Sequence, residues 1–290
     1  MPILVFLLLA LLLATGIALV WQHQQEKGKK PEHSSSSSSS LPAVIESNSP
    51  APGTSESTSS SASSSQDASS SESETTGGVP ASQVVFGEPV PQSGRVKSEY
   101  FDDALFIGDS ISEGIELYQM MDNATVLANK GLNPETIFTK KAAKDAAGNE
   151  VTVIEALKSY QPKKVYVMLG ANGLGWIDKD KFISYYGKLI DEIKSAYPGI
   201  SVYIQSILPV TANFEKKKPE ITNAKIDEYN AAIRALTKDK QVYYVNVAES
   251  FKNDAGALPD EASPKDGMHF GADYYQKWFD YLKTHVVTEE

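Results

Sequence analysis

The chain has 290 residues, a net charge of −10 and no cysteine. Without cysteine there is no disulfide framework, no thiolate nucleophile and no cysteine-ligated metal site. Residues 81–290 keep a net charge of −6 once the N-terminal leader and a Ser-rich segment are set aside. This acidic balance offers no broad positive surface for phosphate backbones, so we do not expect the protein to bind nucleic acid.

The N-terminal segment is strongly apolar. Residues Ile3 to Val20 are 18 uncharged positions, and as a helix they would span about 27 Å, close to the thickness of the hydrocarbon core of a bilayer. A cleaved secretory signal has a shorter apolar core and a small-residue cleavage site, so residues 3–20 favour an uncleaved single-pass anchor within residues 1–30. The alternative is cleavage of this segment, which would give a secreted protein.

Two features of the sequence disagree about topology. Lys27, Lys29 and Lys30 follow the apolar segment, and positive charge normally marks the cytoplasmic side of a membrane. A long Ser-rich tether, however, is typical of enzymes displayed on cell surfaces. We therefore expect the protein at the cell membrane with its folded domain outside the cell.

The tether has a strongly biased composition. Residues 34–80 hold 21 serines, five acidic residues and no lysine or arginine. Such a segment cannot bury enough apolar surface to offset its ordering entropy, which predicts a disordered linker over residues 31–95. Residues 96–290 are then long enough for one folded domain, which we expect to be monomeric.

Short apolar runs alternate with longer amphipathic segments along this domain. Strands separated by helices predict a parallel sheet covered on both faces, with ligands bound beyond the carboxyl ends of the strands. The expected strands are residues 104–107, 124–127, 165–169, 202–207 and 242–247, and the expected helices are residues 112–121, 152–160, 181–196, 221–236 and 272–285.

Ser110 directly follows the first expected strand and opens the first helix. Free N–H groups and the helix dipole at such a position can stabilise an oxyanion, although a serine there can also be an ordinary helix cap. A serine nucleophile needs a base and a group that orients the base. His269 is the one histidine of the domain beside plausible loop residues, and Asp266 precedes it by three positions. The alternative for His269 is an ordinary surface histidine.

Four short blocks, each just beyond a predicted strand or in the last loop, resemble the SGNH (GDSL) hydrolase family over residues 101–285. They are Phe106-Ile107-Gly108-Asp109-Ser110-Ile111 with Gly114, then Asn129 with Gly131, then Gly170-Ala171-Asn172, and finally Asp266-Gly267-Met268-His269. The resemblance implies a flavodoxin-like α/β/α three-layer sandwich with about five parallel strands.

The resemblance also implies the roles of individual residues. Ser110 would be the nucleophile, His269 the general base and then acid, and Asp266 the group that orients His269. The oxyanion hole would consist of the N–H groups of Ser110 and Gly131 and the side-chain amide of Asn172. The chain departs from the family at Gly173, where the family often has an aspartate, so the support of the Asn172 loop can differ.

These expectations describe an esterase that needs no metal and no organic cofactor. No long apolar insertion separates the blocks, which favours a short acyl group. Trp176 and Phe214 are candidates for a pocket wall or a sugar platform, or else ordinary core residues. With the surface tether, the prediction is a short-chain acetyl esterase acting on cell-envelope or environmental glycans. The alternatives are a lysophospholipase or thioesterase, and a non-catalytic membrane-tethered glycan-binding module on the same fold.

Overall fold

The computed structural model describes residues 77–145 and 147–288. These residues belong to one compact unit of the chain, Ser69–Glu290. The predicted anchor at residues 3–20 and most of the predicted linker lie outside the described residues. Within the described ranges, no helix is both long enough and apolar enough to cross a membrane.

The centre of the domain is a five-stranded parallel sheet with the order β3-β2-β6-β7-β8. Within this sheet the chain forms the interior strand β2 first, then the edge strand β3, and then crosses β2 to form β6. This change of direction opens a crevice at the carboxyl ends of β2 and β6. The parallel α/β sheet predicted from the sequence is confirmed. Its strands are β2 (Ala104–Gly108), β3 (Thr125–Ala128), β6 (Lys164–Met168), β7 (Ser201–Gln205) and β8 (Tyr243–Val245).

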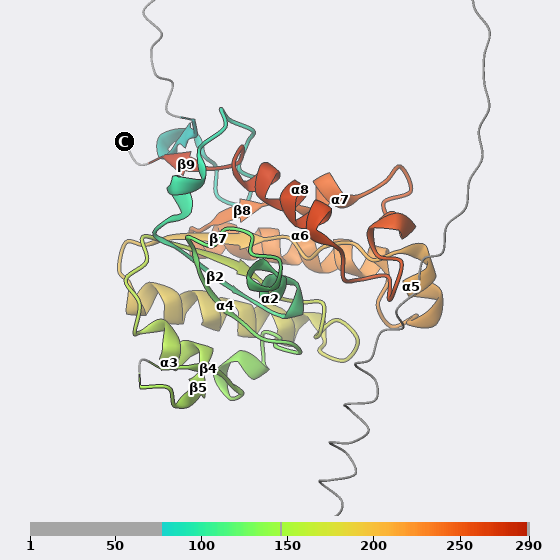
Figure 1. The fold of residues 1–290 in the computed structure, drawn as a ribbon, viewed down its shortest axis with the longest axis horizontal. Helices are drawn as coiled ribbons and strands as arrows, with labels where there is room; N and C mark the ends of the chain where they lie inside the picture. The colour runs from blue at the N-terminus through green and yellow to red at the C-terminus, as the bar shows by residue number, and fades with distance from the viewer. Residues whose placement is uncertain (1–76, 146, 289–290) are drawn as a thin grey trace, which may run out of the picture. The chain divides into compact units, whose positions relative to one another are not determined.

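Helices cover both faces of this sheet, which gives the expected three layers (Figure 1). Side chains alternate between the two faces along each strand: in β2, Leu105 and Ile107 join one buried cluster, and Ala104 and Phe106 join the other. The first cluster includes α3 (Val153–Leu157), α4 (Lys179–Ala196) and α6 (Asn223–Lys240). The second includes α2 (Ser110–Leu117), α7 (Ala248–Phe251) and α8 (Ala272–Leu282).

Local hydrogen bonding explains where several helices begin and end. At the start of α3, Thr152 accepts a hydrogen bond from the Glu155 N–H, and the Glu155 carboxylate accepts one from the Thr152 N–H. This reciprocal cap satisfies N–H groups that have no partner within the helix. Helix α2 ends at Leu117, earlier than predicted, because Gln119 has a left-handed φ of 52° that the helix cannot continue through.

Residues 77–95 belong to the folded domain, which corrects the predicted linker boundary at residue 95. Strand β1 (Val79–Pro80) pairs in parallel with β9 (Val287–Thr288). Val90 is buried, and its N–H donates to the Tyr244 carbonyl at 2.8 Å. The few apolar residues of this segment show no periodicity and their partners lie at the far end of the chain, so the sequence alone does not reveal the contact.

The structure adds short elements that the sequence did not predict. An antiparallel hairpin of β4 (Lys141–Lys144) and β5 (Glu150–Thr152) lies between β3 and α3. Its Lys-Ala-Ala-Lys strand has weak β propensity, which explains why it was missed. Helix α5 (Ala212–Lys217) follows β7. The described 3-10 turns are η1 (Ala81–Gln83), η2 (Ser98–Phe101), η3 (Thr136–Phe138) and η4 (Asp260–Ala262).

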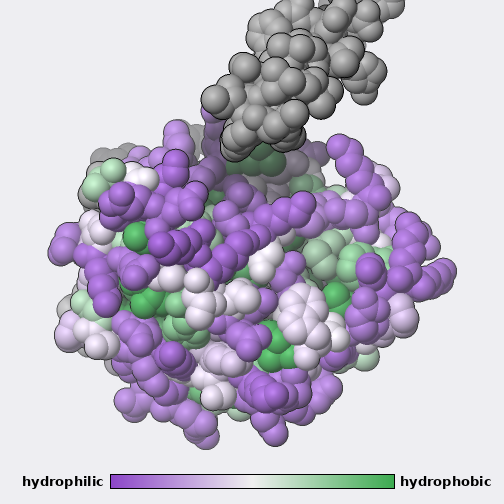
Figure 2. Space-filling model, turned by 90° about the horizontal axis from the view of Figure 1, so that it is seen from below, coloured by the Kyte–Doolittle hydropathy of each residue, from purple (hydrophilic) through white to green (hydrophobic). Residues whose placement is uncertain are grey.

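The surface shown in Figure 2 is mainly hydrophilic, with apolar side chains in small separate patches. Such a distribution is expected when the apolar sides of the helices face the sheet. Among the described residues, the large apolar side chains that remain exposed are those of Val85, Leu117, Tyr118 and Trp176.

Candidate active site

The fold brings Ser110 and His269 together across 159 positions of sequence. Ser110 Oγ lies 2.8 Å from His269 Nε2, and His269 Nδ1 lies 2.7 Å from Asp266 Oδ2. Both distances are those of hydrogen bonds. The three side chains thus form one continuous hydrogen-bonded chain, in which a base can take the serine proton while a carboxylate holds the base.

Ser110 is placed by the tight connection between β2 and α2. The Asp109 side chain caps the helix by accepting a hydrogen bond from the Ile111 N–H at 3.0 Å. A Cβ at Gly108 would lie 2.7 Å from the Met168 carbonyl oxygen, so only glycine lets the strand end pack this closely against β6. The serine hydroxyl is therefore held at the crevice beyond β2 and β6.

Asp266 is held by the backbone of its own turn. Its Oδ1 accepts hydrogen bonds from the N–H groups of Met268 and His269, both at 2.9 Å. Burial raises the pKa of Asp266, but these bonds and the bond to the His269 ring outweigh it and lower the pKa to about 2. Asp266 is therefore ionised at neutral pH and accepts from the Nδ1 side of the imidazole.

Ser263 is a supporting residue that the sequence analysis missed. It is buried, and its hydroxyl lies 2.6 Å from the His269 carbonyl oxygen and 3.1 Å from Asp266 Oδ1. Its oxygen also accepts a hydrogen bond from the Gly267 N–H at 3.0 Å. The serine ties both ends of the turn together, a role that no sequence motif indicated.

The three predicted oxyanion donors follow three neighbouring strands of the sheet. Ser110 begins α2, so its N–H has no acceptor within the helix. Gly131 lies in the turn after β3 with a left-handed φ of 80°. The side-chain Nδ2 of Asn172, after β6, lies 3.3 Å from the Leu132 carbonyl oxygen. This contact brings the Asn172 amide beside Leu132, the residue that follows Gly131.

Two consecutive turns support Asn172. The Gly173 N–H donates to the Gly170 carbonyl at 2.8 Å, and the Ile177 N–H donates to the Gly173 carbonyl at 2.9 Å. A Cβ at Gly173 would lie 3.1 Å from Ile177 Cδ1, a tight contact. At the position where the sequence departs from the family, backbone hydrogen bonds and close packing support the loop.

Replacing Asn172 by alanine should lower kcat for ester hydrolysis by about 10²–10³-fold, because the loss of one oxyanion donor typically has this effect. KM should change little, since the donor acts on charge that develops in the transition state. Steady-state kinetics with p-nitrophenyl acetate measures both constants. Asn149→Ala, in the exposed β4–β5 hairpin, is the matched control, and a loss below tenfold in Asn172→Ala would contradict the donor role.

Asp109 is a buried carboxylate to which the sequence analysis assigned no role. It is 2% exposed and accepts a hydrogen bond from the Ile111 N–H at 3.0 Å, and the Gly170 backbone and the Asn172 side chain also favour its charged form. Burial raises the pKa of Asp109 to about 6, although these bonds and the nearby His269 act in the opposite direction. The carboxylate therefore links the serine block to the asparagine block, which only the tertiary structure shows.

The raised pKa of Asp109 predicts a pH dependence of stability. The ordinary pKa of the group is 3.8 and its pKa in the folded protein is about 6, so between these values the folded state binds more protons than the unfolded state. The free energy of unfolding therefore loses a contribution of up to about 3 kcal/mol as the pH rises from about 4 to about 7.

Urea unfolding of the wild type and of Asp109→Asn at these two pH values tests this expectation. The difference in free energy of unfolding, wild type minus variant, should fall by about 1–3 kcal/mol from the lower to the higher pH. Comparing the pH dependence removes any constant effect of the substitution on packing. A difference that does not change with pH would contradict the raised pKa.

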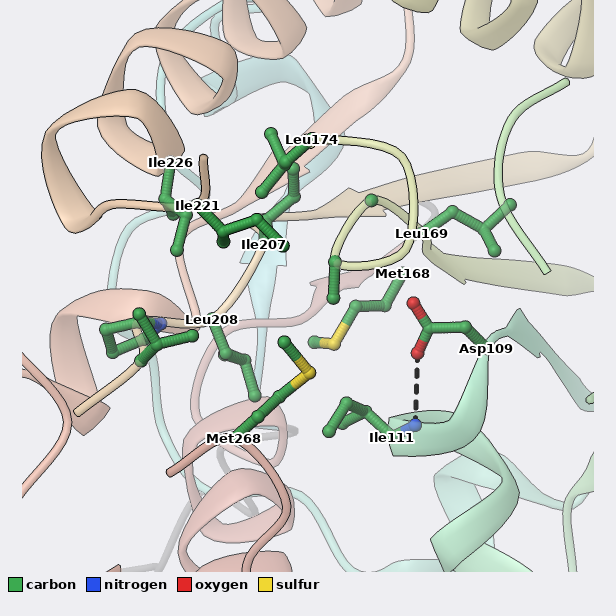
Figure 3. A pocket seen from close by; sticks show the side chains of 14 residues that line it. Asp109, Ile111, Met168, Leu169, Leu174, Ile207, Leu208, Ile221, Ile226 and Met268 are labelled. Carbon is green, nitrogen blue, oxygen red and sulfur yellow. Dashed lines mark hydrogen bonds between the residues drawn. The ribbon is translucent and has the colours of Figure 1, made fainter. Parts of the chain in front are cut away.

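An apolar cavity is lined by Asp109 and Ile111, the two chain neighbours of Ser110 (Figure 3). Its wall includes Ile111 from α2, Met168 at the end of β6, Leu208 beyond β7 and Met268 next to the histidine. The space open to the centre of a water-sized sphere is about 20 Å³, whereas a single water needs roughly 10–15 Å³ on this measure. The accessible space is therefore close to that of a single water molecule.

Neither Trp176 nor Phe214 lines this cavity. Trp176 lies in the loop after β6 with 66% of its surface exposed. Phe214, on α5, lies against Gly267, where a Cβ would be only 2.8 Å from the Phe214 Cβ. Phe214 thus packs against the turn that carries Asp266 and His269, and Trp176 presents its indole to solvent.

Known proteins resemble this chain in sequence and in fold. A family model described as the GDSL-like lipase/acylhydrolase family matches residues 106–277. No curated protein matches the chain significantly. A solved structure described as a platelet activating factor from Streptococcus pneumonia is 22% identical, and the match covers 64% of this chain and 87% of that chain with a TM-score of 0.51.

Two further solved structures are similar to a lesser degree. A GDSL-like lipase from Bacteroides thetaiotaomicron is 17% identical, with 64% of this chain and 86% of that chain covered and a TM-score of 0.46. A carbohydrate esterase family 3 protein from Talaromyces cellulolyticus is 17% identical, with 62% and 93% covered and a TM-score of 0.45. Because the family model spans more than half of its length, the chain belongs to the GDSL-like lipase/acylhydrolase family of ester-bond hydrolases.

Proposed function

We propose that the domain is a serine esterase that hydrolyses short-chain carboxylic esters, acetyl esters above all, through an acyl-enzyme. One observation carries this proposal: Ser110, His269 and Asp266 form a hydrogen-bonded chain with contacts of 2.8 and 2.7 Å, and their chain neighbours Asp109, Ile111 and Met268 line a small apolar cavity. The first part supplies the nucleophile and the base, and the second part supplies room for the acyl group.

In the proposed reaction, Ser110 Oγ attacks the ester carbonyl carbon while His269 Nε2 takes the hydroxyl proton. The N–H groups of Ser110 and Gly131 and the Asn172 amide stabilise the negative oxygen of the tetrahedral intermediate. His269 then donates the proton to the leaving alcohol oxygen, and the acyl group stays on Ser110. In the second half, water attacks this ester as His269 Nε2 takes its proton, the bond from Ser110 Oγ to the acyl carbon breaks, and His269 returns the proton to Ser110 Oγ as the acid leaves. Asp266 holds the Nδ1–H throughout.

The size of the cavity predicts the chain-length preference. With p-nitrophenyl acetate, butyrate and octanoate, kcat/KM should fall by about tenfold or more from acetate to octanoate, because the longer chains do not fit the space beside Ser110. Leu208→Ala shortens a side chain in the cavity wall, so the cavity becomes larger and the preference for acetate over octanoate should decrease. Leu236→Ala is the matched control, because Leu208 and Leu236 are 8% and 9% exposed and only Leu208 lines the cavity.

A preference for octanoate would overturn the acetyl-ester proposal and favour a lysophospholipase or thioesterase. An unchanged preference in Leu208→Ala would show that this cavity does not hold the acyl group. A serine-directed fluorophosphonate that leaves Ser110 unlabelled would overturn the acyl-enzyme itself.

For the alcohol part of the substrate we propose an acetylated glycan. The exposed indole of Trp176, four residues after Asn172, offers a flat apolar face on which the C–H groups of a sugar ring can stack. Trp176→Ala should then raise KM for an acetylated glycan and leave p-nitrophenyl acetate hydrolysis unchanged. Acetate release from a panel of acetylated glycans is the assay, and an equal KM for the glycan in both proteins would contradict this role.

We propose that the domain acts outside the cell, tethered by residues 3–20. The long uncharged apolar run and the Ser-rich segment after it support this placement. Protease added to intact cells should then digest the domain. Digestion only after lysis would contradict the placement.

A further inference from the structure

Lys140 lies beside the turn that carries Gly131. It follows η3 and immediately precedes β4, outside all four sequence blocks. Its ammonium donates to the Asn129 side-chain oxygen at 2.8 Å and to the Lys130 carbonyl oxygen at 2.7 Å. A Cβ built on Gly131 would lie 3.9 Å from Lys140 Nζ. The ammonium is thus bonded to the two residues that precede the proposed oxyanion donor.

The bond to Lys130 acts on the same peptide group that holds the Gly131 N–H. A peptide group is a rigid plane in which the carbonyl and the following N–H point in opposite directions. Fixing the Lys130 carbonyl therefore fixes the direction of the Gly131 N–H. Gly131 has a left-handed φ of 80°, which few residues other than glycine adopt. Because glycine is conformationally permissive, the orientation of this peptide group depends on its hydrogen bonds.

The charge of Lys140 also acts on this peptide. A charge-assisted hydrogen bond is stronger than a neutral one, and a carbonyl that accepts it polarises the attached N–H, which becomes a better donor. Among the described residues, no carboxylate lies within ion-pair distance of Lys140, so its bonds go to neutral oxygens. Lys140 is exposed, and two hydrogen bonds hold its ammonium at a cost in rotamer entropy.

We infer that Lys140 is a positioning residue of the oxyanion hole, which orients and polarises the Gly131 N–H through the Lys130 carbonyl. This inference rests on the proposed function, because it requires Gly131 to donate to the oxyanion. It adds a residue from the segment between η3 and β4, outside the sequence blocks. Lys140 does not touch the substrate, so its removal should change kcat more than KM.

The test compares Lys140→Met, Lys140→Arg and Lys141→Met in the full-length protein with p-nitrophenyl acetate. Loss of a whole donor typically costs about 10²–10³-fold, so weakening one should lower kcat by roughly fivefold to thirtyfold in Lys140→Met, with KM nearly unchanged. Lys140→Arg keeps the donors and the charge and should recover most of the rate. Lys141→Met removes the same charge from the neighbouring position and should behave like the wild type.

Two further measurements read the oxyanion hole directly. Trifluoroacetone forms a tetrahedral adduct with an active serine, and its inhibition constant should rise in Lys140→Met by the same factor by which kcat/KM falls. In protein labelled with [15N]glycine, the Gly131 amide signal should shift in Lys140→Met and stay close to the wild-type position in Lys141→Met. This signal reports the hydrogen bond at the preceding carbonyl whether or not an ester is hydrolysed.

Wild-type kcat in Lys140→Met, or an equal loss in Lys141→Met, would overturn the inference. An unmoved Gly131 signal would overturn it as well. A wild-type protein that neither hydrolyses p-nitrophenyl acetate nor reacts with a fluorophosphonate would instead contradict the proposed function, while the Gly131 signal would still decide whether Lys140 holds the peptide.

Discussion

Replacing Ser110 by alanine is expected to lower kcat for ester hydrolysis by at least about 10⁴-fold, because no other group in the site can form the acyl-enzyme. The hydroxyl lies 2.8 Å from His269 Nε2, and alanine removes it without adding volume. The Ser110 N–H stays in place, so part of the oxyanion hole remains and binding of the ester should change little. Steady-state and single-turnover kinetics with p-nitrophenyl acetate separate these two effects.

Ser195→Ala is the matched control for this substitution. Ser195 is exposed on α4, far along the chain from the sequence blocks, and its loss should leave both kcat and KM at wild-type values. Thermal unfolding should be nearly the same for both variants, since neither removes a buried apolar group. An Ser110→Ala protein that retains one tenth of the wild-type kcat would show that another group is the nucleophile.

His269→Ala should lower kcat to a similar degree, by roughly 10³–10⁶-fold, because the proton of Ser110 then has no acceptor in the site. His269 is the link between Ser110 and the carboxylate of Asp266, whose pKa of about 2 keeps it charged at neutral pH. Without the imidazole, Asp266 has no base to orient toward the serine hydroxyl. Kinetics with p-nitrophenyl acetate across the neutral pH range is the measurement.

The double variant sharpens this prediction. Residues that act as one catalytic unit are not additive, so Ser110→Ala combined with His269→Ala should be about as slow as the slower single variant. Lys265→Ala, an exposed residue of the same turn, is the control for disturbance of the loop. Losses that multiply in the double variant would show that the two residues act independently.

The amino-acid sequence alone was sufficient to predict the class of fold and to propose Ser110, His269 and Asp266, which the structure brings into hydrogen-bond contact. The α/β sheet could be predicted because buried strands and amphipathic helices have periodicities that do not depend on the rest of the chain. Ser110, His269 and Asp266 could be proposed because the short blocks around them resemble those of a known family. The predicted absence of a thiol nucleophile also follows directly from a sequence with no cysteine.

Supporting contacts could not be predicted in the same way. Asp109 stands in a recognisable motif, but its burial against Gly170 and Asn172 depends on how two strand ends meet. Lys140 immediately precedes a hairpin with weak strand propensity, and nothing in the sequence places its ammonium on the Lys130 carbonyl. Trp176 and Phe214 were indistinguishable as candidates until the structure showed one exposed and the other packed on a turn.

The sequence by itself thus predicted the α/β fold, which the structure confirms, and proposed Ser110, His269 and Asp266, because the blocks around them are short stretches of chain that resemble a known family. Only the tertiary structure decided where the domain begins, which of these side chains lie within hydrogen-bond distance of one another and how large the cavity is. Those properties depend on contacts between distant segments, such as β1 with β9 and β6 with β7. Long-range packing sets their geometry, and local sequence patterns do not predict it.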